Sequence, residues 1–134
     1  MKKFMLNIFL FLLIALIGCG ADNDSVHVTT SDTIPVEFAG KTNPLGSDAV
    51  TAGAEVFKDY CSACHGDEGH GDGPAGAALD LSPKNLAELQ TRVGDDYLLW
   101  RISTGKDGTA MLAWQGTLTE TQIWQVISFI RTLK

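Results

Sequence analysis

The spacing of apolar residues divides the chain into an apolar start, a polar middle and a helical remainder. Residues 4–17 are almost continuously apolar. Residues 20–47 are rich in Asp, Asn, Ser and Thr and keep neither a helical nor a strand period for long. Apolar side chains then recur at helical spacing in the segments 48–60, 95–104 and 119–133. The pattern therefore predicts one small all-α domain of three or more helices over residues 48–134.

The ends of the helical segments carry residues that typically begin and end helices. Thr119 with Gln122 three residues later has the sequence of a capping box, in which side chains and backbone of the first turn bond each other reciprocally. Ser47 or Asp48 can cap the first helix, and Gly105 is placed to end the second. These signals support the three predicted helices.

The first 18 residues have the organisation of a secretory signal. Lys2 and Lys3 precede the apolar stretch, which is too short to span a membrane comfortably and is followed by small residues. The run ending in Cys19, Leu-Ile-Gly-Cys, resembles the lipobox of bacterial lipoproteins, which are cut before a cysteine that then carries lipid. We therefore expect residues 1–18 to be a lipoprotein signal peptide and Cys19 to be the lipid attachment site. An ordinary signal peptide cut near Ala21, or an uncleaved anchor, is the alternative.

Residues 19–47 are expected to be a lipidated, flexible tether between membrane and domain. Their polar composition offers too little apolar surface to form a core. Ile34, Val36 and Phe38 alternate, so a short extended segment lying against the domain is the other possibility. His27 is expected to be solvated.

The run Cys61-Ser62-Ala63-Cys64-His65 has the form C-x-x-C-H, which is typical of covalent haem attachment. Two thiols at this spacing can add to the two haem vinyl groups, and the imidazole that follows can reach the iron. A chance match, a dithiol redox pair or half of a zinc site are the alternatives, but a zinc site needs a second cysteine or histidine pair that the sequence lacks. The motif occurs once, so one covalent haem c is expected, held by Cys61 and Cys64 with His65 as iron ligand. A haem would also supply the centre of a core that three helices cannot fill alone.

Residues 43–133 resemble the class I monohaem cytochromes c, particularly the bacterial type that works with respiratory complexes. Five stretches carry the resemblance: Gly53-Ala54-Glu55-Val56-Phe57, Cys61-Ser62-Ala63-Cys64-His65-Gly66, Gly71-Asp72-Gly73-Pro74, Gly108-Thr109-Ala110-Met111 and Val126-Ile127-Ser128-Phe129-Ile130-Arg131. The resemblance implies the small class I cytochrome c fold. It also implies that the first and last helices cross closely, with Gly53 beside Phe129.

Met111 is the expected sixth iron ligand. It is the only methionine left once a signal peptide is removed, and the family likewise supplies methionine from this segment. Histidine with methionine is a usual pair in electron-transfer haems. A core methionine, with the sixth position open or taken by His70 or His27, is the alternative. Leu112 follows where the family commonly has proline, which implies a less rigid loop.

The surroundings of the haem are less specified. The resemblance implies that His65 donates its second ring N–H to the carbonyl of Pro74. His70 is expected at the surface, and Trp100 and Trp114 near the porphyrin edge. Candidates for the propionates are Tyr97, Trp114, Lys84 and Arg92. Candidates for the pocket wall, which suit an ordinary core equally well, are Phe57, Leu79, Leu81, Leu86, Leu98 and Ile102.

Charge and ligand set together predict an electron-transfer function. Removing the two lysines of the signal from 10 basic residues leaves 8 against 16 acidic ones, a net charge of −8, which disfavours nucleic acid as a partner and favours basic redox partners. Two protein ligands on the iron leave no open site for catalysis, so the chain is expected not to be an enzyme itself. We expect a one-electron carrier, lipid-anchored at the periplasmic or outer face of a bacterial membrane. A quinol-oxidising complex would be its donor and a terminal oxidase or reductase its acceptor. A fixed cytochrome c subunit of a larger membrane oxidoreductase, or a haem enzyme or sensor with an open sixth site, is the alternative.

Overall fold

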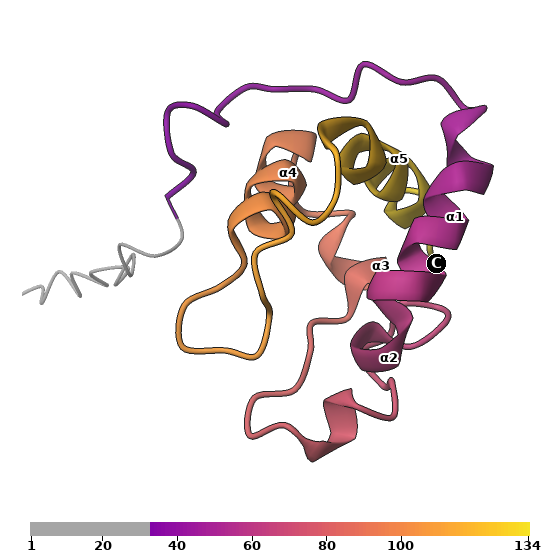
Figure 1. Cartoon of the computed structure of the whole chain (residues 1–134), viewed down its shortest axis with the longest axis vertical. Coiled ribbons are helices and arrows are strands. Elements are labelled where there is room, and N and C mark those ends of the chain that lie inside the picture. Colours follow the sequence, from indigo (N-terminus) through magenta and orange to yellow (C-terminus); the bar gives the residue numbers. More distant parts are fainter. Residues whose placement is uncertain (1–32) are drawn as a thin grey trace, which may run out of the picture.

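The computed structural model describes residues 33–134, and these form a helical domain (Figure 1). The predicted signal peptide, Cys19 and His27 lie outside the described residues. The helices are α1 (Ala49–Tyr60), α2 (Ser62–His65), α3 (Leu86–Leu89), α4 (Asp95–Thr104) and α5 (Glu120–Ile130), with a 3₁₀ turn, η2 (Gly76–Ala78). Residues 33–134 contain no β-strand. The all-α prediction is confirmed.

The three long helices begin and end close to the predicted residues. Thr119 forms the capping box that the sequence predicts: its hydroxyl accepts the Gln122 N–H at 3.2 Å, and its own N–H donates to the Gln122 side chain at 2.9 Å. Gly105 ends α4 with a positive φ of 71°. Asp48 stands at the N-terminus of α1, but its side chain makes no capping hydrogen bond. The short helices α2 and α3 were not specified by the apolar pattern.

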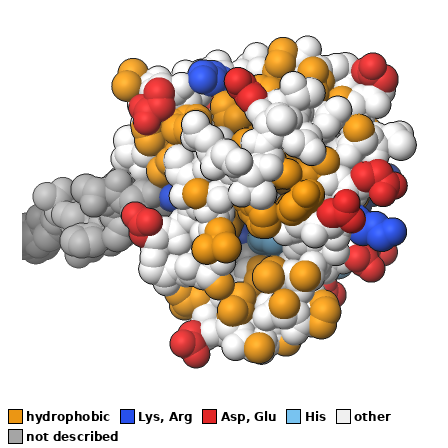
Figure 2. Space-filling view, viewed as in Figure 1, with side chains coloured by type: hydrophobic (Ala, Val, Ile, Leu, Met, Phe, Trp, Pro, Cys, Tyr) orange, Lys and Arg blue, Asp and Glu red, His pale blue; other side chains and the backbone are white. Residues whose placement is uncertain are grey.

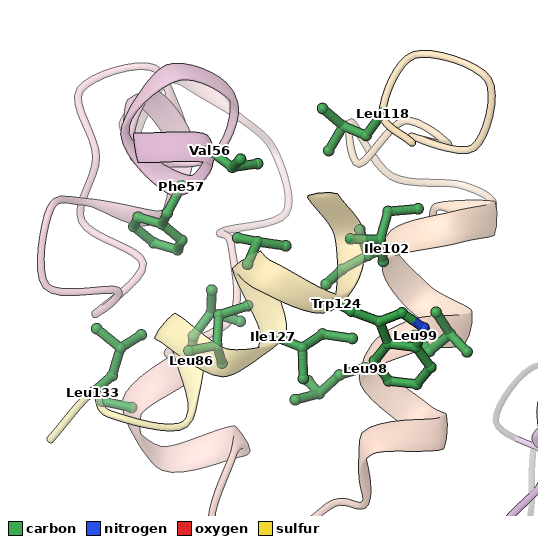
Figure 3. Close-up of a cluster of buried hydrophobic side chains, with 14 residues drawn as sticks. Val56, Phe57, Leu86, Leu98, Leu99, Ile102, Leu118, Trp124, Ile127 and Leu133 are labelled. Atoms are coloured by element: carbon green, nitrogen blue, oxygen red, sulfur yellow. The ribbon is translucent and has the colours of Figure 1, made fainter. Parts of the chain in front are cut away.

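The core is built around α5, which lies between α1 and α4 (Figure 3). Val56 and Phe57 of α1 face it from one side, and α4 contributes its apolar face from the other. Phe57, Val126 and Ile127 are almost completely buried. The remaining buried members of the cluster are Leu86, Ala87, Leu98, Leu99, Ile102, Leu118, Ile123, Trp124, Ile130 and Leu133.

The crossing of α1 and α5 depends on Gly53. A Cβ atom at this position would overlap the backbone carbonyl of Gln125 and lie 3.1 Å from the Cβ of Phe129. The two backbones therefore approach more closely than any side chain at position 53 would allow. Phe57 and Phe129 pack beside this point with ring centroids 5.0 Å apart. The implied packing of Gly53 against Phe129 is confirmed.

Residues 38–45 run across α4 and α5 instead of belonging to a free tether. The side-chain amide of Asn43 donates to the Trp124 carbonyl and to the Ser128 hydroxyl, both at 2.9 Å. The backbone N–H of Asn43 donates to Asp95 at 2.9 Å. These bonds join the segment to both helices, so this part of the region predicted as tether belongs to the folded domain.

The alternation of Ile34, Val36 and Phe38 suggested a short extended segment, but the structure has turns there. Residues 36–40 form turns, and the Phe38 N–H donates to the Pro35 carbonyl at 2.9 Å. Phe38 packs against the core, whereas Val36 is 90% exposed. The turn therefore places Phe38 against the core and Val36 in solvent.

Among residues 33–134, none of the helices combines the length and apolarity that crossing a bilayer requires.

Replacing Gly53 with alanine should destabilise the domain. The added methyl group overlaps backbone of α5, and this cost exceeds the gain of about 1 kcal/mol from better helix propensity. We expect the free energy of unfolding to fall by about 2 kcal/mol, measured by guanidinium denaturation of the haem-loaded protein. The control is Glu55→Ala, an exposed position on the same helix, which should change stability little. Equal stability of Gly53→Ala and the unaltered protein would contradict the close crossing.

Candidate haem site

The C-x-x-C-H motif lies where α1 passes directly into α2. The Cys61 N–H still bonds the Phe57 carbonyl of α1 at 2.8 Å, and the Cys61 carbonyl accepts the N–H groups of Cys64 at 3.2 Å and His65 at 2.9 Å. The two cysteines are therefore one helical turn apart and lie on the same side of the helix. Both thiols are free. This is the arrangement that two thioether bonds to one porphyrin edge require.

The two sulfurs are also close enough to influence one another. Burial, with a smaller contribution from the neighbouring Cys64, raises the pKa of the Cys61 thiol to about 12. Cys61 is consequently a protonated thiol at neutral pH. The site thus offers paired thiols and fits the covalent attachment of haem.

The ring of His65 is held by a backbone carbonyl, but not by that of Pro74. Its Nδ1 lies 3.1 Å from the carbonyl oxygen of Lys84, so Nδ1–H is the donor and Nε2 is left for the iron. Burial lowers the pKa of His65, although the bond to Lys84 partly opposes this. The imidazole is therefore neutral at pH 7, which is the form that binds a metal.

Pro74 is not the hydrogen-bond acceptor of His65, because its loop is held elsewhere. The N–H groups on either side of it, at Gly73 and Ala75, bond the carbonyls of Cys64 and Ala63 at 3.2 and 2.8 Å. This holds the loop against the backbone of α2, and Pro74 is exposed. The chain approaches the ring of His65 only later, after Pro83.

Small residues let the loop after the motif pack closely under α2. A Cβ atom at Gly73 would lie 2.5 Å from the Ala63 carbonyl, and one at Gly76 would lie 2.5 Å from the Cys64 carbonyl. Gly71 has a positive φ of 83°, and a Cβ there would lie 2.5 Å from the carbonyl of Pro83. The glycine spacing in this loop therefore positions the segment that carries the Lys84 carbonyl.

Met111 lies in a loop whose ends are tied together. The Lys106 N–H donates to the Met111 carbonyl at 3.1 Å, and the Met111 N–H donates to the hydroxyl of Thr109, also at 3.1 Å. Thr109 in turn donates to the Lys106 carbonyl at 2.7 Å. Met111 packs against the core, whereas Leu112 is 70% exposed. Hydrogen bonds thus order the loop although the proline common in the family is missing.

In Figure 1 the two candidate ligand segments lie in the lower half of the domain, with α2 on the right and the loop after α4 on the left. Figure 2 shows the same face as a surface, where hydrophobic side chains surround a depression with a histidine side chain at its base. Leu81, 60% exposed, contributes to the apolar surface of the domain. Of the other candidates for the pocket wall, Phe57, Leu86, Leu98 and Ile102 belong to the main core, and Leu79 is half-buried.

The structure also separates the other candidate residues. His70 is at the surface, where it lies 3.3 Å from Glu68. Arg92 is exposed and paired with Glu88 at 3.6 Å, which makes it a surface residue. Lys84 contributes through its backbone, as described above.

Arg101 is the residue that the sequence analysis overlooked. It is only 9% exposed, and its guanidinium lies 3.7 Å above the ring of Trp100 and 5.6 Å from that of Tyr97. Its position in the sequence, between Trp100 and Ile102 of an apolar helix, is the signal that could have identified it.

The fold, the paired thiols and the oriented imidazole define a c-type cytochrome. The family model "Cytochrome C oxidase, cbb3-type, subunit III" matches residues 48–130. The chain is 36% identical over 95 residues to the Cbb3-type cytochrome c oxidase subunit FixPc of Rhizobium leguminosarum bv. viciae, and 36% over 98 residues to subunit FixP of Bradyrhizobium sp. strain ORS 278. These matches cover 70% and 72% of this chain, but the chain spans only 31% of the length of either relative.

Among solved structures, cytochrome cL of the marine bacterium Methylophaga aminisulfidivorans has a TM-score of 0.50 and 25% identity, covering 63% of this chain and 55% of the other. The chain belongs to the family of cbb3-type cytochrome c oxidase subunit III. The predicted cytochrome c fold is thereby confirmed, and so is covalent haem c as the cofactor of this family.

Displacing the segment that holds His65 should raise the reduction potential. In Gly71→Ala the new methyl group pushes against Pro83, which weakens the bond from His65 to Lys84 and makes the imidazole a poorer donor to ferric iron. A hydrogen bond of about 1 kcal/mol corresponds to a rise on the order of tens of millivolts in a redox titration.

Two controls accompany this measurement. Gly40→Ala introduces the same backbone strain at a φ of 74° with no atoms nearby, and Pro74→Ala alters the residue first expected to be the acceptor. Neither should move the potential. A shift in Pro74→Ala with none in Gly71→Ala would contradict the role of the Lys84 carbonyl.

Proposed function

We propose that this chain is the electron-transferring cytochrome c subunit of a membrane oxidoreductase of the cbb3 oxidase type. The observation that carries the proposal is the family match over residues 48–130, since the relatives named above are oxidase subunits. A lipid-anchored carrier that is not part of a complex, the first expectation from the sequence, has less support. In either case the chain is an electron-transfer component and not the catalytic subunit.

The residues of the site suit this role. Cys61 and Cys64 would hold the haem covalently, and His65 would bind its iron through Nε2 while Lys84 fixes the ring. Met111 would supply the sixth ligand from its hydrogen-bonded loop. The bound haem supplies reversible one-electron chemistry. With His65 and Met111 both holding the iron, the chain would exclude small molecules from the metal and favour electron transfer over catalysis.

Removal of the thioether of Met111 tests this ligand set. In Met111→Ala we expect loss of the weak far-red band of methionine bound to ferric haem, together with binding of added cyanide or imidazole within the mixing time. Leu112→Ala, at the exposed neighbouring position, should retain the band. If Met111→Ala keeps the spectrum of the unaltered protein, another residue is the sixth ligand.

The proposal includes export and anchoring at the membrane. Residues 1–18 would be removed as a lipoprotein signal peptide, and Cys19 would carry the lipid at the periplasmic or outer face of a bacterial membrane. Because residues 38–45 pack on the domain, the flexible part of the tether would end before residue 38. A quinol-oxidising complex as donor and a terminal oxidase or reductase as acceptor are the redox partners we infer.

Haem-stained native gels of detergent-solubilised membranes distinguish a subunit from a carrier. We expect the chain to migrate with a large oxidase complex, both as the unaltered protein and as Cys19→Ser, because subunit contacts would hold it when the lipid is missing. A carrier would instead run as a single small band, and its Cys19→Ser form would appear in the soluble fraction. That second result would contradict the subunit proposal while leaving haem binding intact.

A further inference from the structure

Tyr60 and Trp114 join the two segments that carry the candidate iron ligands. Tyr60 is the last residue of α1 and precedes Cys61, whereas Trp114 follows Met111 by three residues. Their ring centroids lie 5.4 Å apart with the planes at 74°, an edge-to-face contact. The haem attachment helix and the methionine loop are therefore in direct contact through these two side chains.

Trp114 is the fixed partner in this contact. Its backbone N–H donates to the Ile102 carbonyl of α4 at 3.0 Å. Its backbone carbonyl accepts the N–H groups of Thr117 at 3.0 Å and Leu118 at 2.8 Å. Its side chain packs against the buried core. Tyr60, in contrast, is 41% exposed and lies on the outer side of the pair. The ring of Trp114 is thus held in place by the core, and the ring of Tyr60 packs against it from the solvent side.

The methionine loop needs such a contact because its own bonds do not fix its position relative to α1. The bonds among Lys106, Thr109 and Met111 close the loop on itself, and the backbone N–H of Trp114 ties its end to α4. Leu112, which stands where a proline would stiffen the chain, is 70% exposed and gives little support. The edge-to-face pair acts between α1 and the loop, where those hydrogen bonds do not reach.

We propose that Tyr60 is a positioning residue whose ring, held on Trp114, keeps the Met111 loop closed over the haem attachment site. This inference rests on the proposed ligation by His65 and Met111 and adds the element that slows displacement of the thioether. Tyr60 touches neither iron ligand in this role. It acts through Trp114, by lowering the frequency with which the loop opens.

The test is the rate at which imidazole replaces methionine in the ferric, haem-loaded full chain. Stopped-flow spectroscopy follows the loss of the far-red band. Tyr60→Ala should accelerate imidazole binding roughly two- to tenfold, the range expected for loss of one aromatic pair. Tyr60→Phe retains the ring and should restore the rate of the unaltered protein. Asp59→Ala, at the exposed neighbouring position of α1, serves as the matched control and should leave the rate unchanged.

A second variant separates the aromatic contact from general loosening. Trp114→Leu should accelerate imidazole binding by a similar factor, and combining it with Tyr60→Ala should add little, since both remove the same contact. Guanidinium denaturation of each variant reports global stability. Because the side chain of Tyr60 is partly exposed, the Tyr60→Ala variant should remain folded even if the Trp114→Leu variant is unstable.

The outcomes are distinct. An unchanged rate in Tyr60→Ala, or equal acceleration in Tyr60→Phe, would overturn the inference while leaving the proposed function in place. An unaltered protein without the far-red band would contradict methionine ligation, and with it both proposals. Acceleration in Tyr60→Ala with rescue by Tyr60→Phe would support the positioning role.

Discussion

The close crossing of α1 and α5 at Gly53 is the constraint on which the rest of the structure depends. Without a side chain at this position, the α1 backbone lies directly against that of α5. Because α1 continues into Cys61, the crossing sets the position of the haem attachment site relative to the core. On its other side α5 supports α4, which leads to Met111. Both candidate ligand segments are thus positioned through one helix pair.

The loops of the site add orientation to this scaffold. Glycines allow the loop after α2 to pack on the carbonyls of that helix, and the following chain brings the Lys84 carbonyl to His65. Half-buried and hydrogen-bonded, the imidazole is neutral and its ring direction is determined before any metal binds. The methionine side relies on hydrogen bonds within its loop and on the Tyr60 contact. The histidine side of the site is therefore held by more contacts with the rest of the domain than the methionine side.

The chain entering the domain is itself part of the fold. Asp95 accepts the Asn43 N–H and pairs with Arg131 of the chain after α5 at 2.7 Å, so a single carboxylate joins three segments. Arg131 also donates to the Val93 carbonyl at 3.0 Å. These bonds determine where the N-terminal region leaves the domain.

The sequence alone was sufficient for features that arise from local interactions. Helical spacing, the Thr119 capping box and the C-x-x-C-H motif act within a few residues, so α1, α4, α5 and the attachment site could be predicted. The acceptor of His65, the packing of residues 38–45, the burial of Arg101 and the Tyr60 contact with Trp114 could not. Each depends on which distant segments meet when the helices pack; the bond from His65 to Lys84, for example, spans 19 residues. Only the tertiary structure decides such pairings, because many polar and aromatic side chains are locally equivalent candidates and packing brings together just one set.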